Sequence, residues 1–274
     1  MAIKMVAIDI DGTLINDNRE ITPKTVAAIK KASEQGVKIV LCTGRPMTGV
    51  SAYLDQLGLN NRDDEYVVSF NGGLAQTTSK KVMVNYSISF NDYADWVNYC
   101  LKEGVHSQIE TRDYIYTTNQ DLSPYTIYES ELVSMPVRYR SIDEMARTRD
   151  QYVVIKAMMV DTKEVIDRAW KDLPQEMADR FSIVRSEDFY LEFMHKSASK
   201  GQALNRLCDE LGITANEVMA LGNAQNDDSM IEFAGTGVAM GNSVPGTRQI
   251  ADDITADNNH DGVAAAIEKY VFNN

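Results

Sequence analysis

Short apolar runs that end abruptly in polar residues recur along the chain. The first run, residues 3–8, is rich in β-branched side chains and stops at residues 9–13, Asp-Ile-Asp-Gly-Thr. Residues 37–43 repeat the pattern before a Gly-Arg pair, and residues 66–70 repeat it before Asn71. Runs of this kind are typical of buried strands, and their polar ends mark where each strand stops.

Helical patterns separate these strands. Thr22 and Pro23 are favourable residues for a helix start, and Gly36 is favourable for its end. A strand, a helix and a strand within about forty residues predict a βαβ unit, and hence a parallel sheet with a right-handed crossover. The same alternation of helices and strands is predicted near the end of the chain, where a helical pattern at 199–211 precedes an apolar run at 218–221.

The middle of the chain has a different pattern. Residues 82–191 alternate apolar and polar positions in several stretches, which is typical of half-exposed strands, and helical patterns are mixed among them. This mixture predicts an α+β insert with an antiparallel sheet. We therefore predict an α/β fold with a Rossmann-like parallel core, formed by residues 1–81 and 192–274, that is interrupted by a second domain at 82–191.

Composition limits the partners. The formal net charge of −13 argues against nucleic acid, which rewards a basic face, and no apolar run is long enough to cross a bilayer. The N-terminus leads directly into the first strand, so we expect no signal peptide. The three cysteines, Cys42, Cys100 and Cys208, have no metal-like spacing and are expected to be buried free thiols, which indicates a cytoplasmic protein.

Asp9 and Asp11 are the first candidates for chemistry. Side chains alternate along a strand, so both carboxylates project to the same side at the point where the strand ends. Two carboxylates that close repel each other unless a cation lies between them or one is protonated. In open α/β sheets this edge is where ligands bind. The alternative is a turn that carries two solvated acids.

Four segments, taken in order, resemble the motifs of the haloacid dehalogenase (HAD) superfamily. They are residues 9–13 (Asp-x-Asp-Gly-Thr), 43–45 (Thr-Gly-Arg), 199–201 (Ser-Lys-Gly) and 222–227 (Gly-x-x-x-Asn-Asp). Their spacing is similar to that of the Cof-type (subfamily IIB) sugar phosphatases. The resemblance implies a magnesium-dependent phosphatase of small phosphorylated metabolites, most often sugar phosphates. It also implies that the insert is a C2-type cap domain.

The resemblance assigns roles to individual residues. It implies that Asp9 is the nucleophile that forms an aspartyl-phosphate, and that Asp11 is the general acid and base. Thr43, Lys200 and the backbone near Gly12 would contact the phosphoryl oxygens. These side chains suit the chemistry, because a carboxylate can attack phosphorus and a second one can move protons. Phosphoryl transfer otherwise requires mainly positioning and charge neutralisation.

Other assignments leave alternatives open. Arg45 could bind substrate or brace its own loop, and Asn71 could contact substrate or simply form a turn. Asn226 could hydrogen-bond the phosphate or position Lys200. The substrate-binding candidates are Gly12, Thr43, Gly44, Arg45, Asn71, Lys200 and Asn226.

Oxygen ligands predict a hard divalent cation, magnesium above all. The metal candidates are Asp9, Asp11, Asn223 and Asp227. The resemblance implies that Asp11 contributes its backbone carbonyl, and Asp227 could either ligate the ion or orient groups around it. The three histidines lie far apart and outside the motifs: His106, His195 and His260.

Asn223 departs from the family pattern, which has an aspartate at this position. The loss of one negative charge predicts magnesium binding weaker by roughly ten- to a hundredfold, unless Asp227 replaces the missing ligand.

A phosphate-binding protein with weakened turnover is therefore one alternative function. The other is a phosphomutase or phosphotransferase that uses the same covalent intermediate. We expect a monomer or a small homo-oligomer.

Overall fold

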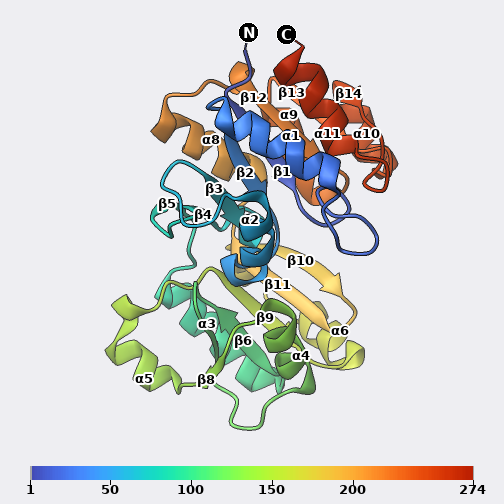
Figure 1. The fold of residues 1–274 in the computed structure, drawn as a ribbon. Coiled ribbons are helices and arrows are strands. Elements are labelled where there is room, and N and C mark those ends of the chain that lie inside the picture. Colours follow the sequence, from blue (N-terminus) through green and yellow to red (C-terminus); the bar gives the residue numbers. More distant parts are fainter. Residues whose placement is uncertain (1, 274) are drawn as a thin grey trace. The chain divides into compact units, whose positions relative to one another are not determined.

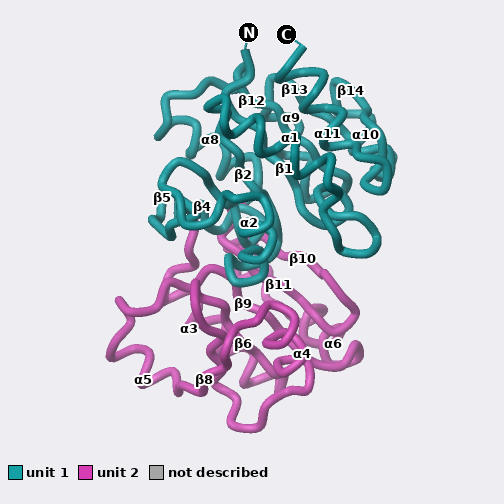
Figure 2. The backbone as a smooth tube through the Cα atoms, in the orientation of Figure 1, with its two compact units in different colours: residues 1–85, 199–274 teal, residues 86–198 magenta. Residues whose placement is uncertain are grey.

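The structure, a computed structural model, describes residues 2–273, which form two compact units. The first unit runs up to Asn85 and resumes at Ser199, and the second is Tyr86–Ala198 (Figures 1 and 2). A single insertion therefore divides the first unit in sequence.

An eight-stranded sheet forms the centre of the first unit. Neighbouring strands are parallel from β14 to β3, and the last two strands are antiparallel. The strands, in their order across the sheet, are β14 (Asp253–Ile254), β13 (Thr236–Ala239), β12 (Val218–Gly222), β1 (Met5–Asp9), β2 (Lys38–Cys42), β3 (Tyr66–Ser69), β4 (Leu74–Thr77) and β5 (Val82–Asn85).

Helices cover both faces of this sheet (Figure 1). Apolar side chains of α1 (Pro23–Glu34), α2 (Ser51–Leu57) and α11 (Gly262–Ile267) share one buried core with Ile8 and Leu41 of the central strands. The helices α8 (Lys200–Leu211) and α9 (Asp228–Phe233) pack against other strands of the sheet and against each other, and α10 (Pro245–Ile250) lies beside α9. Burial on both faces explains why the central strands are continuous apolar runs.

Local signals set the helix boundaries where the sequence predicts them. The hydroxyl of Thr22 accepts a hydrogen bond from the Thr25 N–H, and Pro23 occupies the first turn of α1. Ser199 caps α8 in the same way, and Gly212 ends it in the left-handed conformation. The predicted α/β fold class is confirmed.

The second unit contains a six-stranded, mostly antiparallel sheet, in which only the outer pair β7–β8 is parallel. Its strands, in their order across the sheet, are β10 (Phe181–Glu187), β11 (Tyr190–His195), β9 (Lys156–Val160), β6 (Ser107–Glu110), β7 (Ile115–Thr117) and β8 (Val137–Tyr139). Its helices are α3 (Phe90–Glu103), α4 (Pro124–Val133), α5 (Ile142–Arg147), α6 (Lys163–Lys171) and α7 (Gln175–Ala178).

The unit boundaries differ by a few residues from those expected at 82 and 191. Residues 82–85 form β5, which pairs with β4 in the first unit. Residue 192 lies inside β11, which pairs with β9 and β10 of the second unit. The hydrogen bonds of these two strands, which an apolar–polar pattern does not reveal, determine where each belongs.

One further sequence expectation concerns burial. Cys42, Cys100 and Cys208 are free and buried, as expected. Within residues 2–273, no helix combines the length and the apolar character that a membrane crossing requires.

A cluster of charged residues is buried in the second unit. The ammonium of Lys156 lies 3.1 Å from Glu110 Oε1 and 3.7 Å from Oε1 of both Glu129 and Glu192. The Glu110 side chain is fully enclosed. Burial raises the pKa of Glu110 to about 8, because Lys156 opposes this effect only in part and the other two carboxylates add to it.

We predict that Glu110→Gln reduces the pH dependence of thermal stability. Because the pKa of Glu110 is raised by folding, its stabilising contribution is complete below its ordinary pKa and is lost as the pH rises towards 8. The melting temperature of the wild type should therefore fall more than that of the variant between about pH 5 and pH 9. Calorimetry at several pH values measures this difference. Glu131→Gln, at an exposed position of the same unit, is the control, and parallel curves for all three proteins would contradict the prediction.

Candidate active site

The candidate residues gather at one edge of the first unit's sheet. Asp9 ends β1, Thr43 follows β2, and Asn223 follows β12. Because β1 lies between β2 and β12 and all three are parallel, their carboxyl ends are adjacent. Lys200 is the first residue of α8 and also belongs to this unit.

Lys200 is the centre of the site. Its side chain is completely buried, and its ammonium donates to Asp9 Oδ1 at 2.7 Å and to Asp227 Oδ1 at 2.6 Å. Burial alone would lower the pKa of Lys200, but the two carboxylates hold it above its ordinary value. Lys200 is therefore a buried cation that is held by two carboxylates.

The residue that follows Lys200 makes this buried position possible. Gly201 has no side chain, and a Cβ atom there would lie 2.1 Å from the backbone oxygen of Ser229 in α9. Only glycine allows α8 and α9 to approach so closely. That approach brings Lys200 next to Asp227, which directly precedes α9.

Asp9 is a buried carboxylate that lies against this cation. Its side chain is 7% exposed. Burial raises the pKa of Asp9 to about 7; Lys200 opposes the shift, while Asp227 and Asp11 add to it. A desolvated carboxylate at the end of a strand is a candidate nucleophile.

Asp227 organises the loop after β12. Its Oδ2 accepts hydrogen bonds from the backbone N–H groups of Asn223 (2.8 Å) and Ala224 (3.0 Å), while Oδ1 accepts from Lys200. A Cβ atom on Gly222 would lie 2.4 Å from Cβ of Asp227, so this arrangement requires glycine. Both oxygens of Asp227 are thus engaged in orienting the protein. These contacts favour the orienting one of its two predicted roles.

Asp11 pairs with Arg45. The guanidinium donates from Nε to Asp11 Oδ2 (2.9 Å) and from Nη2 to Asp11 Oδ1 (2.5 Å). Arg45 is itself held near the ring of Tyr53, and its Nη1 donates to the Gly49 carbonyl at 3.4 Å. The Asp11 side chain is 55% exposed, in contrast to Asp9. The two aspartates therefore occupy very different environments.

The remaining substrate-binding candidates form two groups. Thr43 is buried, and its hydroxyl accepts from the Arg45 N–H at 3.1 Å. Asn226 donates from Nδ2 to Asn71 Oδ1 at 3.1 Å, and Gly44 lies beside the Asn71 amide. The structure therefore brings together candidates from two of the motifs and Asn71, which follows a separate strand.

Sequence reasoning missed the residues that hold the Gly12 loop. The amide of Asn242 donates to the Gly12 carbonyl oxygen at 2.8 Å, and Asn242 Oδ1 accepts from the Asn258 N–H at 3.3 Å. Asn242 follows β13, so it too stands just beyond a strand end at this edge. That position was the signal that could have identified it.

Asn223 turns one end of its amide towards three oxygen atoms. This end lies 3.0 Å from the Asp11 carbonyl oxygen, 3.2 Å from Asp9 Oδ2 and 3.1 Å from Thr13 Oγ1. With nitrogen at this end, the two N–H groups of the amide have all three oxygens within hydrogen-bond distance; with oxygen there, the amide accepts from the Thr13 hydroxyl. Amide orientation is assigned from such partners, and the hydrogen bonds favour nitrogen.

The same atoms can form a cation site. Octahedral ligands about 2.1 Å from magnesium lie about 3.0 Å from their neighbours, which matches the separations around Asn223. Asp9 Oδ2, the Asp11 carbonyl and Asn223 Oδ1 are hard oxygen donors, so the residues present fit magnesium. Only one of the three carries charge. The other two donors are a backbone carbonyl and an amide. Within residues 2–273, no group of three or more His, Cys, Asp and Glu residues is placed to hold a metal ion.

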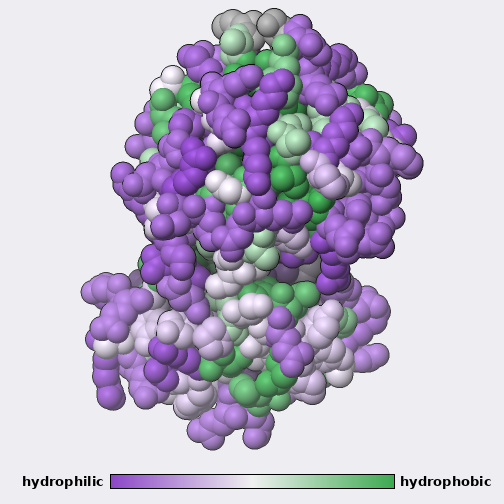
Figure 3. Space-filling model, in the orientation of Figure 1, coloured by the Kyte–Doolittle hydropathy of each residue, from purple (hydrophilic) through white to green (hydrophobic). Residues whose placement is uncertain are grey.

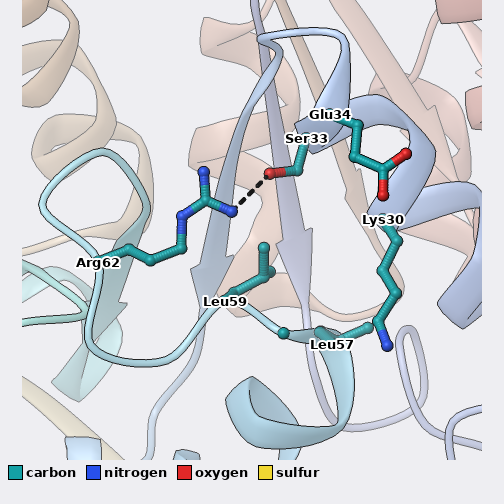
Figure 4. A pocket seen from close by; sticks show the side chains of 7 residues that line it. Lys30, Ser33, Glu34, Leu57, Leu59 and Arg62 are labelled. Atoms are coloured by element: carbon teal, nitrogen blue, oxygen red, sulfur yellow. Dashed lines mark hydrogen bonds between the residues drawn. The ribbon is translucent and has the colours of Figure 1, made fainter.

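A separate hollow of about 200 Å³ lies elsewhere in the first unit (Figure 4). None of the predicted site residues lines it. Its polar wall includes Ser33, which accepts a hydrogen bond from Arg62 at 3.2 Å, and Leu57 and Leu59 contribute apolar surface.

Comparisons with known proteins agree with this geometry. Residues 6–267 match the family model described as haloacid dehalogenase-like hydrolase. The chain is 43% identical, over the full length of both chains, to a Streptococcus pyogenes protein named "Putative phosphatase". It is 39% identical to a Bacillus subtilis protein with the same designation, over 98% of each chain. The crystal structure of a haloacid dehalogenase-like hydrolase from Bacteroides thetaiotaomicron is similar as well, with a TM-score of 0.84 and 30% identity over 97% of this chain and 99% of that one.

Proposed function

The chain belongs to the haloacid dehalogenase-like hydrolases, and from this premise we propose that it is a magnesium-dependent phosphatase of small phosphorylated metabolites, in particular sugar phosphates. The observation that carries the proposal is the buried ion-pair triad, in which Lys200 bridges Asp9 and Asp227. In this triad the proposed nucleophile is desolvated and lies beside a cation, at the kind of sheet edge where α/β proteins bind ligands.

In the proposed reaction, Asp9 attacks the phosphorus atom of the substrate. The bond from phosphorus to the leaving oxygen breaks, and Asp11 gives that oxygen a proton. A water molecule then attacks the phosphorus of the aspartyl-phosphate and gives a proton to Asp11. The bond to Asp9 breaks and inorganic phosphate leaves.

Asp11 must leave Arg45 before it can donate a proton. Both of its carboxylate oxygens accept hydrogen bonds from the guanidinium, so neither oxygen is free to donate a proton to the substrate. Arg45, once released, is free to contact the anionic substrate. Lys200 and Thr43 are the proposed contacts to the phosphoryl oxygens. The hydrogen-bonded pair Asn71 and Asn226 is proposed to contact the substrate as well.

Magnesium would be held by Asp9, the backbone carbonyl of Asp11 and Asn223. When bound, it supplies positive charge for the phosphoryl oxygens. In this proposal Asp227 orients Lys200 and the loop that carries Asn223. The buried free thiols are consistent with a reducing compartment such as the cytoplasm.

The test is phosphate release from an aryl phosphate and from a panel of sugar phosphates, with magnesium and with EDTA. We expect magnesium-dependent release from both kinds of substrate. No release from any of them would contradict the proposal. Formation of an isomeric sugar phosphate without free phosphate would instead identify a phosphomutase.

We assign substrate discrimination to the insert, and a deletion tests this. Residues 86–198 can be replaced by a short glycine-serine linker between β5 and α8, which pack against each other. We expect a folded protein that retains some action on aryl phosphates and loses discrimination among sugar phosphates. Circular dichroism and the same phosphate assay measure both effects. An unfolded product would contradict the assignment of the first unit as an independent domain.

A further inference from the structure

The Asn223 side chain is confined to one place. Its backbone N–H donates to Asp227 Oδ2 at 2.8 Å, and its carbonyl accepts from the Val244 N–H at 3.0 Å. The other end of its amide lies against the backbone of Gly12, where a Cβ atom would come within 2.6 Å of it. Rotation of the terminal amide can therefore exchange its nitrogen and oxygen without moving the rest of the residue.

The nitrogen and the oxygen of this amide interact in opposite ways with the same neighbouring atoms. Its nitrogen donates hydrogen bonds, and its oxygen accepts hydrogen bonds or binds a cation. The point in question is 3.2 Å from Asp9 Oδ2 and 3.0 Å from the Asp11 carbonyl oxygen. With nitrogen there, both oxygens gain a donor. With oxygen there, all three become ligands for one ion.

The Thr13 hydroxyl fits either orientation. Its Oγ1 lies 3.1 Å from the same end of the amide, and a hydroxyl can both donate and accept. Thr13 is buried, so its partner has to come from the protein. It can donate to the amide oxygen, or it can share an N–H of the amide nitrogen with one of the other two oxygens.

We propose that Asn223 is a reversible internal substitute for the cation. When no cation is bound, its amide nitrogen bridges Asp9 and the Asp11 carbonyl. When magnesium binds, the amide rotates and presents its oxygen. This inference rests on the magnesium site of the proposed function and extends it, because the site is then satisfied in both states.

An aspartate at this position would behave differently. Its carboxylate has no donor, and at the position of the amide it would lie about 3.2 Å from Asp9 Oδ2. Without a cation the two carboxylates repel each other, and with a cation both bind it. The asparagine thus weakens magnesium binding but keeps the site stable without the ion.

The experiment compares the full-length wild type with Asn223→Asp by calorimetry and by titration with MgCl₂. After EDTA treatment we expect the variant to melt about 2–6 °C below the wild type. Magnesium should then raise its melting temperature more than that of the wild type, and its magnesium affinity should be about ten- to a hundredfold higher. Asn216→Asp is the matched control, because Asn216 is exposed and precedes β12 at the opposite end of the strand. It should follow the wild type.

Two results would overturn the inference. Equal melting temperatures without metal and equal magnesium shifts in both proteins would overturn it alone, since the proposed magnesium site would remain. The absence of any magnesium shift in either protein would overturn it together with the magnesium dependence of the proposed function.

Discussion

Replacing Asp9 by asparagine abolishes turnover, with an expected loss of at least about 10⁴-fold in kcat, a scale that fits the removal of a nucleophile. An amide of nearly the same size cannot form the acyl-phosphate bond. Steady-state assays with an aryl phosphate measure this loss. A variant that retains a substantial fraction of the wild-type rate would contradict a covalent role for Asp9.

The Asp9→Asn protein should remain folded, which separates chemistry from stability. The side chain is buried, and desolvation disfavours its charged form, so an uncharged isostere is well suited to the site. Its amide oxygen can still accept the hydrogen bond from Lys200, which lies 2.7 Å from Asp9 Oδ1. We expect a melting temperature at least as high as that of the wild type.

Replacing Lys200 by methionine should damage both activity and stability. Asp9 and Asp227 would lose their shared cation inside a buried site, and breaking a buried pair in this way costs about 3–5 kcal/mol. The loss of a charged phosphoryl contact should lower kcat by about 10²–10³-fold. Calorimetry and the phosphate assay measure the two effects.

A second substitution tests the electrostatic origin of this damage. Asp227→Asn in the Lys200→Met background removes one of the two uncompensated carboxylates, so we expect part of the stability to return. Activity should stay low, because the cation is still missing. An unchanged melting temperature in Lys200→Met would show that Lys200 is not the counterion of the site.

The sequence predicts the parallel core because apolar runs and strand-end motifs are local features. Once β1, β2 and β12 are parallel neighbours, the topology of the sheet itself brings Asp9, Thr43 and Asn223 to one edge. The convergence of the motifs is therefore a consequence of chain order and needs no knowledge of side-chain contacts.

Pairings between side chains could not be predicted in this way. The sequence left Arg45 open between binding substrate and bracing its loop, whereas the structure pairs it with Asp11 across 34 positions of sequence separation. That choice depends on rotamers and on the neighbouring Tyr53. The sequence pattern likewise does not predict that Asn242, which belongs to none of the motifs, hydrogen-bonds to Gly12.

The buried charges of the second unit were missed for a different reason. Glu110 and Lys156 lie in strands whose alternation of apolar and polar residues predicts one exposed face. Charged residues in such strands are expected on that solvated face. In the structure Glu129 of α4 joins them, and all three are buried. Alternation identifies the two faces of a strand, but it does not reveal which of them another element covers.

The most direct test of the central claim is the detection of a phosphoryl group on Asp9. In Asp11→Asn, an aryl phosphate with a good leaving group should still phosphorylate the enzyme, whereas hydrolysis lacks its general base and should be slow. After rapid acid quenching, mass spectrometry should find the phosphoryl group on Asp9, together with a burst of aryl alcohol that matches the enzyme concentration. Release of aryl alcohol without a phosphoryl group on Asp9, or with one on another residue, would contradict the account.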